Sequence, residues 1–181
     1  MEYPRRHPYK IEPEDGRLAL MPPFGGVRFL IGGEETGEHL AILEHPLEPK
    51  GASMRHTHSR EDEYTFVLEG RIGFEIGGEE FTADPGTLVL KPRGIPHAFW
   101  HTTDAPARVL ELVSPAGLEH FFEEMMALGA AGGPPDPAAM APVQERYGIT
   151  IDPESSRELA QRHGLRMITP NAQAAAGAAR D

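Results

Sequence analysis

Two histidines alternate with threonine in the stretch Gly51-Ala52-Ser53-Met54-Arg55-His56-Thr57-His58, and Glu63 follows after a short polar run. Residues two apart on a β-strand point to the same face, with their Cα atoms roughly 6.6 Å apart. Both imidazoles can therefore converge on one metal ion, at about 2.1 Å from each nitrogen. A bend in the polar run 59–62 would bring the Glu63 carboxylate to the same interior face as a third ligand.

A second cluster contains turn residues and one further histidine, in the stretch Gly86-Thr87-Leu88-Val89-Leu90-Lys91-Pro92-Arg93-Gly94-Ile95-Pro96-His97. Pro and Gly favour a tight turn after the apolar run, since Pro fixes φ and Gly supplies positive φ. The turn delivers His97 onto the next strand. His97 is thus the candidate for a fourth ligand.

These two stretches resemble the two signature motifs of the cupin superfamily, with HxH, Glu and Gly in the first and Gly, Pro, Gly and His in the second. The resemblance covers residues 36–115 and implies an all-β, double-stranded β-helix (jelly-roll) barrel. It also implies four metal ligands: His56, His58, Glu63 and His97. The acidic neighbours Glu61 and Asp62 compete with Glu63 on chemistry alone, and the motif spacing favours Glu63.

The ligand atoms that the chain offers limit which metal ions it can bind. The chain has no cysteine, so a metal must be held by nitrogen and oxygen. Three histidines and one carboxylate leave one or two open positions on a five- or six-coordinate ion. We therefore expect one divalent transition metal ion, and Fe, Mn, Ni, Co, Cu and Zn all stay open.

The rest of the chain fits a β-barrel with appended helices. Gly and Pro are abundant, with 20 and 18 residues, which favours short strands joined by turns. Strands are expected at residues 27–31, 39–44, 64–68, 71–76, 80–83, 87–90, 96–101 and 108–113. The expected organisation is an N-terminal extension (1–35), the barrel (36–115), a helical extension (116–168) and a disordered tail (169–181).

Three helices are expected after the barrel. The first begins at Ser114-Pro115 and ends at Gly129, and the others run from Asp136-Pro137 to Gly148 and from Asp152-Pro153 to Gly164. Pro142 is expected to kink or shorten the second helix. The segments 130–135 and 171–177 are poor in large apolar residues, so we expect them to be mobile.

Strand alternation predicts which neighbours of the ligands also face the interior. Four side chains are expected to line a substrate pocket: Met54, Thr65, Phe99 and His101. His101 lies roughly 13 Å along the strand from His97, so we expect a pocket or structural role and not a fifth ligand. Trp100 points the opposite way, toward packing or an interface. Glu111 lies in an apolar run and either lines the barrel or faces outward.

Charge and hydropathy restrict the partners. The net charge of -11 with scattered basic residues argues against nucleic acid, and no apolar stretch is long enough to span a bilayer. We expect a cytoplasmic protein with a small-molecule substrate. We also expect a homodimer, because a jelly roll leaves sheet edges that a segment such as Tyr9 to Ile11 could cover.

The single barrel followed by a helix resembles the quercetin dioxygenase-like proteins of bacteria. That resemblance implies O₂-dependent cleavage of a small enol or flavonol-like substrate. Glu63 would then take the substrate proton as the catalytic residue, and Phe99 would hold an aromatic ring. A non-catalytic, metal-anchored binding module and a metal-dependent isomerase stay open as alternatives.

Overall fold

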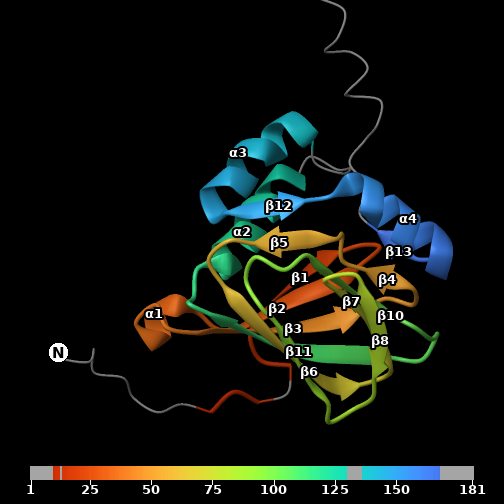
Figure 1. The fold of residues 1–181 in the computed structure, drawn as a ribbon. Helices are drawn as coiled ribbons and strands as arrows, with labels where there is room; N and C mark the ends of the chain where they lie inside the picture. Colours follow the sequence, from red (N-terminus) through yellow and green to blue (C-terminus); the bar gives the residue numbers. More distant parts are fainter. Residues whose placement is uncertain (1–9, 13, 130–135, 168–181) are drawn as a thin grey trace, which may run out of the picture.

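Two β-sheets pack face to face in the computed structural model, which describes residues 10–12, 14–129 and 136–167 (Figure 1). The first sheet has the strand order β1 (Arg17–Met21), β2 (Gly25–Ile31), β3 (Ala41–Leu47), β11 (Ala107–Ser114), β6 (Asp62–Glu69) and β9 (Leu88–Lys91). The second sheet has the order β12 (Ile149–Ile151), β5 (His56–His58), β10 (His97–His101), β4 (Gly51–Ala52) and β13 (Arg166–Met167). In addition, β7 (Ile72–Ile76) pairs with β10 and β8 (Glu79–Ala83) pairs with β7.

The alternation of the sequence decides which face of each strand is buried. In β3 and β11, buried residues alternate strictly with half-buried ones, which is the pattern of a strand with one face on a core. The buried faces enclose an apolar core that includes Phe24, Val67, Phe74 and Val109. The expected all-β jelly-roll barrel is therefore confirmed, and each of the eight expected strands overlaps an observed one.

Three helices follow the barrel and lie over its upper side in Figure 1. They are α2 (Leu118–Gly129), α3 (Pro137–Tyr147) and α4 (Pro153–His163). Helices α3 and α4 have the expected boundaries, because Asp136 and Asp152 cap their N-termini and glycines at 148 and 164 end them in the left-handed conformation. Helix α2 begins at Leu118, later than expected, and α3 continues past Pro142 and is not shortened there. A four-residue helix, α1 (Gly33–Thr36), precedes β3.

Both stretches that flank the expected barrel add strands to it. From residues 1–35, β1 and β2 are hydrogen-bonded in series to β3. From residues 116–168, β12 pairs with β5, and β13 pairs in parallel with β4. The segments expected to be mobile or disordered, 130–135 and 169–181, and the start of the segment Tyr9 to Ile11 lie outside the described residues.

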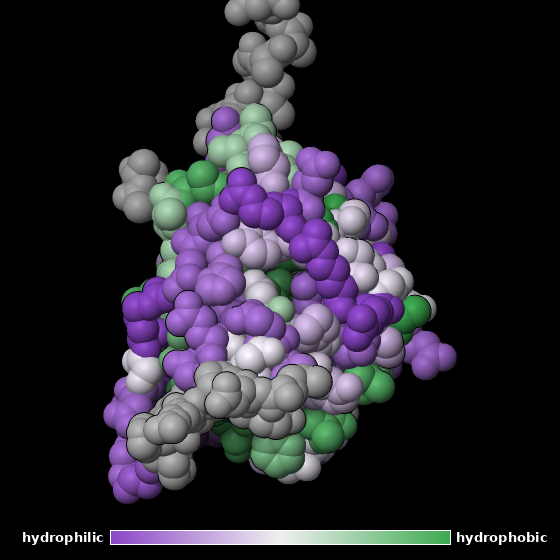
Figure 2. Space-filling model, turned by 90° about the vertical axis from the view of Figure 1, so that its left-hand side faces the viewer, coloured by the Kyte–Doolittle hydropathy of each residue, from purple (hydrophilic) through white to green (hydrophobic). Residues whose placement is uncertain are grey.

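The surface of the barrel is mixed in character. Figure 2 shows one flank that is mostly hydrophilic, with a small hollow near its middle in which hydrophobic side chains are visible. Within the described residues, no helix has the length and the apolar character needed to cross a bilayer.

Candidate metal centre

Strand pairing brings the four expected ligands together. His56 and His58 lie on β5, Glu63 lies near the start of β6, and His97 begins β10, where it pairs directly with His56. One ligand atom from each residue lies within 4.8 Å of those of the other three. We call these four residues the His/Glu cluster. The sequence motifs therefore predicted the cluster correctly.

The backbone orients two of the imidazoles. His56 Nδ1 lies 2.7 Å from the carbonyl oxygen of Met54, and His97 Nδ1 lies 3.0 Å from that of Ile95. In a neutral ring, an Nδ1–H that donates to a carbonyl leaves the lone pair on Nε2. Such an arrangement is usual for histidines that bind metals through Nε2.

The distances and the unsatisfied atoms fit a metal ion. His97 Nε2 lies 3.0 Å from Glu63 Oε2, and two adjacent ligands on an octahedral ion with bonds of about 2.1 Å are about 3.0 Å apart. Both ring nitrogens of His58 are buried and have no hydrogen-bond partner among the residues that the structure describes. A buried polar atom without a partner costs about 1–3 kcal/mol, and a cation bound at Nε2 would remove that cost for one of the two nitrogens.

Burial also prepares the histidines as ligands. It lowers the pKa of His56 well below its ordinary value, and the charges of His97 and His58 lower it further. Burial lowers the pKa of His58 to about 4, although the nearby Glu63 carboxylate opposes the change. Neutral imidazoles at physiological pH are the form that binds metals.

A buried lysine next to the cluster was not anticipated. Lys91 is 1 % exposed, and its Nζ lies 2.8 Å from Glu63 Oε2 and 3.0 Å from Glu111 Oε2. Burial raises the pKa of Glu63, but the nearby Lys91 ammonium and other neighbouring groups lower it well below the ordinary value. The alternation of β9 could have shown that Lys91 faces inward, since Val89 is also buried.

The side chain of Glu111, for which the sequence left an inward and an outward orientation open, faces the barrel interior. Thr65 Oγ1 lies 3.0 Å from each of its carboxylate oxygens. Burial raises the pKa of Glu111 to about 7, with a smaller contribution from the Glu63 charge, although Lys91 opposes the change. A carboxyl group with this pKa can take up or release a proton near neutral pH.

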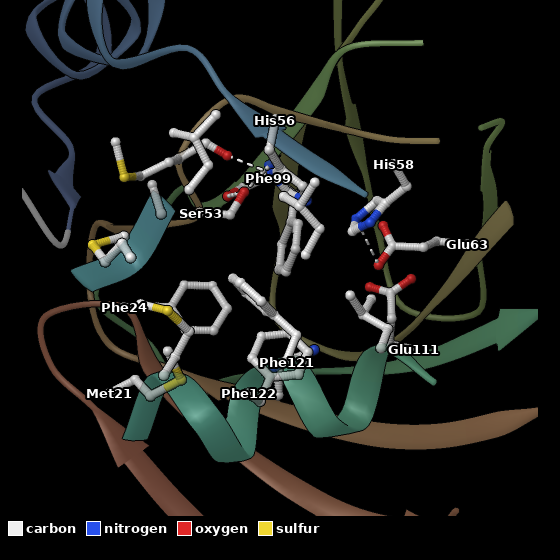
Figure 3. A pocket seen from close by; sticks show the side chains of 18 residues that line it. Met21, Phe24, Ser53, His56, His58, Glu63, Phe99, Glu111, Phe121 and Phe122 are labelled. Carbon is white, nitrogen blue, oxygen red and sulfur yellow. Dashed lines mark hydrogen bonds and ion pairs between the residues drawn. The ribbon is translucent and has the colours of Figure 1, made fainter. Parts of the chain in front are cut away.

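An apolar pocket of ≈ 130 Å³ opens onto the His/Glu cluster (Figure 3). Phe121 and Phe122 of α2 form one wall, and Phe24 and Met21 lie beside them. Its lining also includes Met54 and Phe99, as expected, together with Ser53, His45 and Glu111. Helix α2 and strand β12 contribute apolar side chains that no motif had marked, including Met125 and Ile149.

Two expected pocket residues do not line this pocket. Thr65 is fully buried between strands and holds Glu111. His101 is buried at the far end of β10, where Nδ1 contacts the carbonyl of Glu48 and Nε2 contacts the hydroxyl of Thr103. The alternation of side chains along each strand correctly predicted that both side chains face the barrel interior. It could not predict how far along the barrel each one lies from the pocket. Trp100 faces away from the pocket and stacks on His163 at 4.8 Å between ring centroids.

Comparison with known proteins agrees with this geometry. Residues 44–113 match the family model described as "Cupin domain". The barrel therefore has the cupin fold. A curated relative, "Tetracenomycin polyketide synthase protein TcmJ" of Streptomyces glaucescens, is 28 % identical over 92 residues. The match covers 50 % of this chain and 62 % of the relative, so this chain spans less than two thirds of that protein.

Solved structures share the cupin fold at low identity. KdgF from Halomonas sp. has a TM-score of 0.56 at 18 % identity, over 64 % of this chain and 99 % of that one. The polyketide cyclase RemF from Streptomyces resistomycificus has a TM-score of 0.52 at 23 % identity, over 60 % of this chain and 80 % of that one. At these identities the likeness concerns the fold. None of the three proteins named here is described as a quercetin dioxygenase.

Proposed function

We propose that the chain is a metal-dependent enzyme that acts on a small, largely apolar organic molecule with an enolisable group. One observation carries this proposal: an apolar pocket opens onto a buried cluster of three histidines and one glutamate. His56, His58, Glu63 and His97 would hold the ion. When bound, a divalent transition metal would act as a Lewis acid on a substrate oxygen, and a redox-active ion could also support O₂ chemistry.

The pocket lining favours a neutral substrate over an anionic one. Most of its 18 residues are apolar or aromatic. The charged side chains among the described lining residues are the carboxylates Glu63 and Glu111, with no lysine or arginine. A phosphate or carboxylate group would therefore lack a cationic side chain in this lining, whereas an aromatic ring would contact Phe24, Phe99 and Phe122.

Within the pocket, the side chains divide the remaining tasks. Phe99 and Phe24 pack edge to face at 5.6 Å between ring centroids and would orient a substrate ring. The phenylalanines of α2 exclude water from the same space. Glu111 is suited to accept a substrate proton because burial raises its pKa to about 7. Glu63, the base expected from sequence, has a lowered pKa and a bound Lys91, and is better suited to hold the ion.

The curated relative supports this class of substrate. Its name associates it with a polyketide synthase, and polyketide chains carry the 1,3-diketone groups that enolise readily. Oxidative cleavage of a flavonol or 1,3-diketone remains our proposal for the reaction. A second candidate, an isomerisation or cyclisation without O₂, is favoured by Glu111, since proton transfer at a buried carboxyl requires no oxidant.

The deciding experiment measures metal and oxygen together. The protein is purified without a histidine tag, its metal is identified by elemental analysis, and flavonols and 1,3-diketones are screened with an oxygen electrode and by mass spectrometry. O₂ consumption with cleaved product supports the dioxygenase. Product of unchanged mass without O₂ uptake supports the second candidate, and binding without turnover supports a metal-anchored binding module. Absence of stoichiometric metal would overturn all three.

A variant pair tests the role of Glu111. At saturating metal, Glu111→Gln should lower kcat by a factor of about 10² to 10⁴, as expected for the loss of a general base. Glu119→Gln is the matched control, because Glu119 is also buried but bonds to the backbone of Gly33 in α1. Equal kcat in Glu111→Gln and the wild type would remove Glu111 from the mechanism.

A further inference from the structure

Lys91 occupies an unusual position for a lysine. Its side chain is fully enclosed, and buried lysines are rare unless they are paired. Its ammonium lies between two carboxylates and 4.8 Å from the centre of the Phe99 ring. The only carboxylate of the His/Glu cluster, Glu63, is thus shared between the cluster and a permanent cation within the described structure.

Three neighbouring strands fix this arrangement. Lys91 on β9 pairs with Glu63 on β6, and Thr65 on β6 pairs with Glu111 on β11. The strand register therefore sets the order Thr65, Glu111, Lys91, Glu63, with contacts of 3.0, 3.0 and 2.8 Å. The position of each of these four side chains is determined by the hydrogen-bonded strand pairing of its backbone and by contact with the next side chain in the series.

The Lys91 contact falls on the carboxylate oxygen of Glu63 that lies beside His97. Glu63 Oε2 lies 2.8 Å from Lys91 Nζ and 3.0 Å from His97 Nε2. The other carboxylate oxygen, Glu63 Oε1, lies 3.5 Å from His58 Nε2. Lys91 therefore determines where Oε2 lies relative to the cluster.

We propose that Lys91 is a positioning residue of the metal centre, which holds Glu63 Oε2 at the ligand corner beside His97, and that Glu111 and Thr65 hold Lys91 in turn. This inference rests on the metal centre proposed above. It assigns a function to a buried cation that would otherwise only repel a metal ion.

The two possible roles of Lys91, to position Glu63 or only to contribute a charge, predict opposite changes in metal affinity when Lys91 is removed. If Lys91 contributed only its charge, its removal would strengthen the binding of a dication, because like charges repel. If Lys91 positions Glu63, its removal should weaken binding roughly 10- to 100-fold, which is the usual cost of losing a group that orients a metal ligand. The sign of the change in affinity therefore decides between the two.

The experiment titrates the metal-free protein with Co(II) alone. We compare the wild type with Lys91→Met, Glu111→Gln and the double variant, and read both the dissociation constant and the visible absorption bands of bound Co(II). We expect weaker binding and a changed spectrum in both single variants. Because Glu111 acts through Lys91, Glu111→Gln should add little in the Lys91→Met background. Arg28→Met, which breaks a buried ion pair on β2, should leave both readouts unchanged.

Further outcomes separate this inference from the proposed function. No Co(II) binding by the wild type overturns the proposed function and this inference with it. Wild-type binding with equal or tighter binding by Lys91→Met overturns this inference alone. If Lys91→Met does not fold, the double variant, which removes both charges of the pair, and Thr65→Val, which keeps them, provide the same comparison. If these folded variants bind Co(II) with the affinity and the absorption spectrum of the wild type, the inference about Lys91 is again overturned.

Discussion

His97 Nε2 lies 3.0 Å from Glu63 Oε2, although the two residues are 34 positions apart in the sequence and belong to different sheets. The His/Glu cluster therefore spans the interior of the barrel and does not belong to one hairpin. An ion held there would link the two sheets. Because other residues form the apolar core, substitutions at the cluster should nevertheless affect metal binding more directly than they affect the fold.

The first prediction concerns His97→Ala. We expect this variant to lose tightly bound metal and to remain folded, because the apolar barrel core is formed by other residues and Glu63 keeps its contact with Lys91. Elemental analysis and circular dichroism measure the two effects. His120→Ala is the control, since His120 is exposed and remote from the cluster. Full metal occupancy in His97→Ala would contradict the assignment of four ligands.

The second prediction concerns metal retention in acid. Protons compete with the ion for the histidines, so the stability that the ion contributes should decrease as the pH falls. Burial lowers the pKa of His58 to about 4 and that of His56 well below its ordinary value. The loss should therefore occur below the ordinary histidine pKa of about 6.5. Thermal melts from pH 8 to pH 4, with and without chelator, should converge toward pH 4, and a gap of constant size would contradict histidine ligation.

The third prediction concerns His45 in the metal-free protein. Burial lowers the pKa of His45 to about 4, so between pH 6.5 and pH 4 the unfolded chain binds a proton that the folded chain does not. The free energy of unfolding should then fall with falling pH through this range. Glu111, with its raised pKa, acts in the opposite direction between its ordinary value and about 7. The difference in the free energy of unfolding between the wild type and His45→Gln cancels the contribution of Glu111, which both proteins share. This difference should decrease from pH 7 to pH 4. A difference independent of pH would refute the lowered pKa of His45.

The fourth prediction concerns the contact between Gly73 and Trp100. A Cβ atom at position 73 would lie 2.2 Å from Cε2 of the Trp100 ring, and the ring is itself packed between β10 and α4. Gly73→Ala should therefore lower the free energy of unfolding by about 1–3 kcal/mol, the usual cost of overpacking. Gly129→Ala is the control, because no atom of the described residues lies within 4 Å of its Cβ position. Chemical denaturation measures both, and equal stability of the two variants would contradict the contact.

The fifth prediction is a homodimer. The outermost strands of the first sheet carry exposed leucines, with Leu20 73 % exposed on β1 and Leu88 61 % exposed on β9. Unpaired strand edges with apolar side chains favour association. Light scattering should give twice the mass of the single chain at micromolar concentration. Leu20→Arg or Leu88→Arg should shift this mass toward the monomer, and a monomeric wild type would refute the prediction.

Local patterns predicted the strands and the four residues of the His/Glu cluster because both depend on short spacings. HxH on one strand and a histidine after a Pro-Gly turn are visible without knowledge of pairing. Lys91 and Glu111 could not be paired in this way, because their contacts depend on the order of β9, β6 and β11 in the sheet. Alternation gives the face of a strand but not the depth along the barrel, which is why the sequence left a pocket role and a structural role open for His101. The short strands β12 and β13 follow helices and have no distinctive pattern.

The pairing of β12 with β5 has a consequence during protein synthesis. The strand that carries His56 and His58 has β10 on one edge and β12 on the other, and β12 lies at residues 149–151 (Figure 1). While the ribosome is still adding these residues, the nascent chain already contains the four residues of the His/Glu cluster, but one edge of β5 is still uncovered. We therefore expect a metal ion captured during translation to exchange more readily before residues 149–151 have emerged and paired with β5 than afterwards.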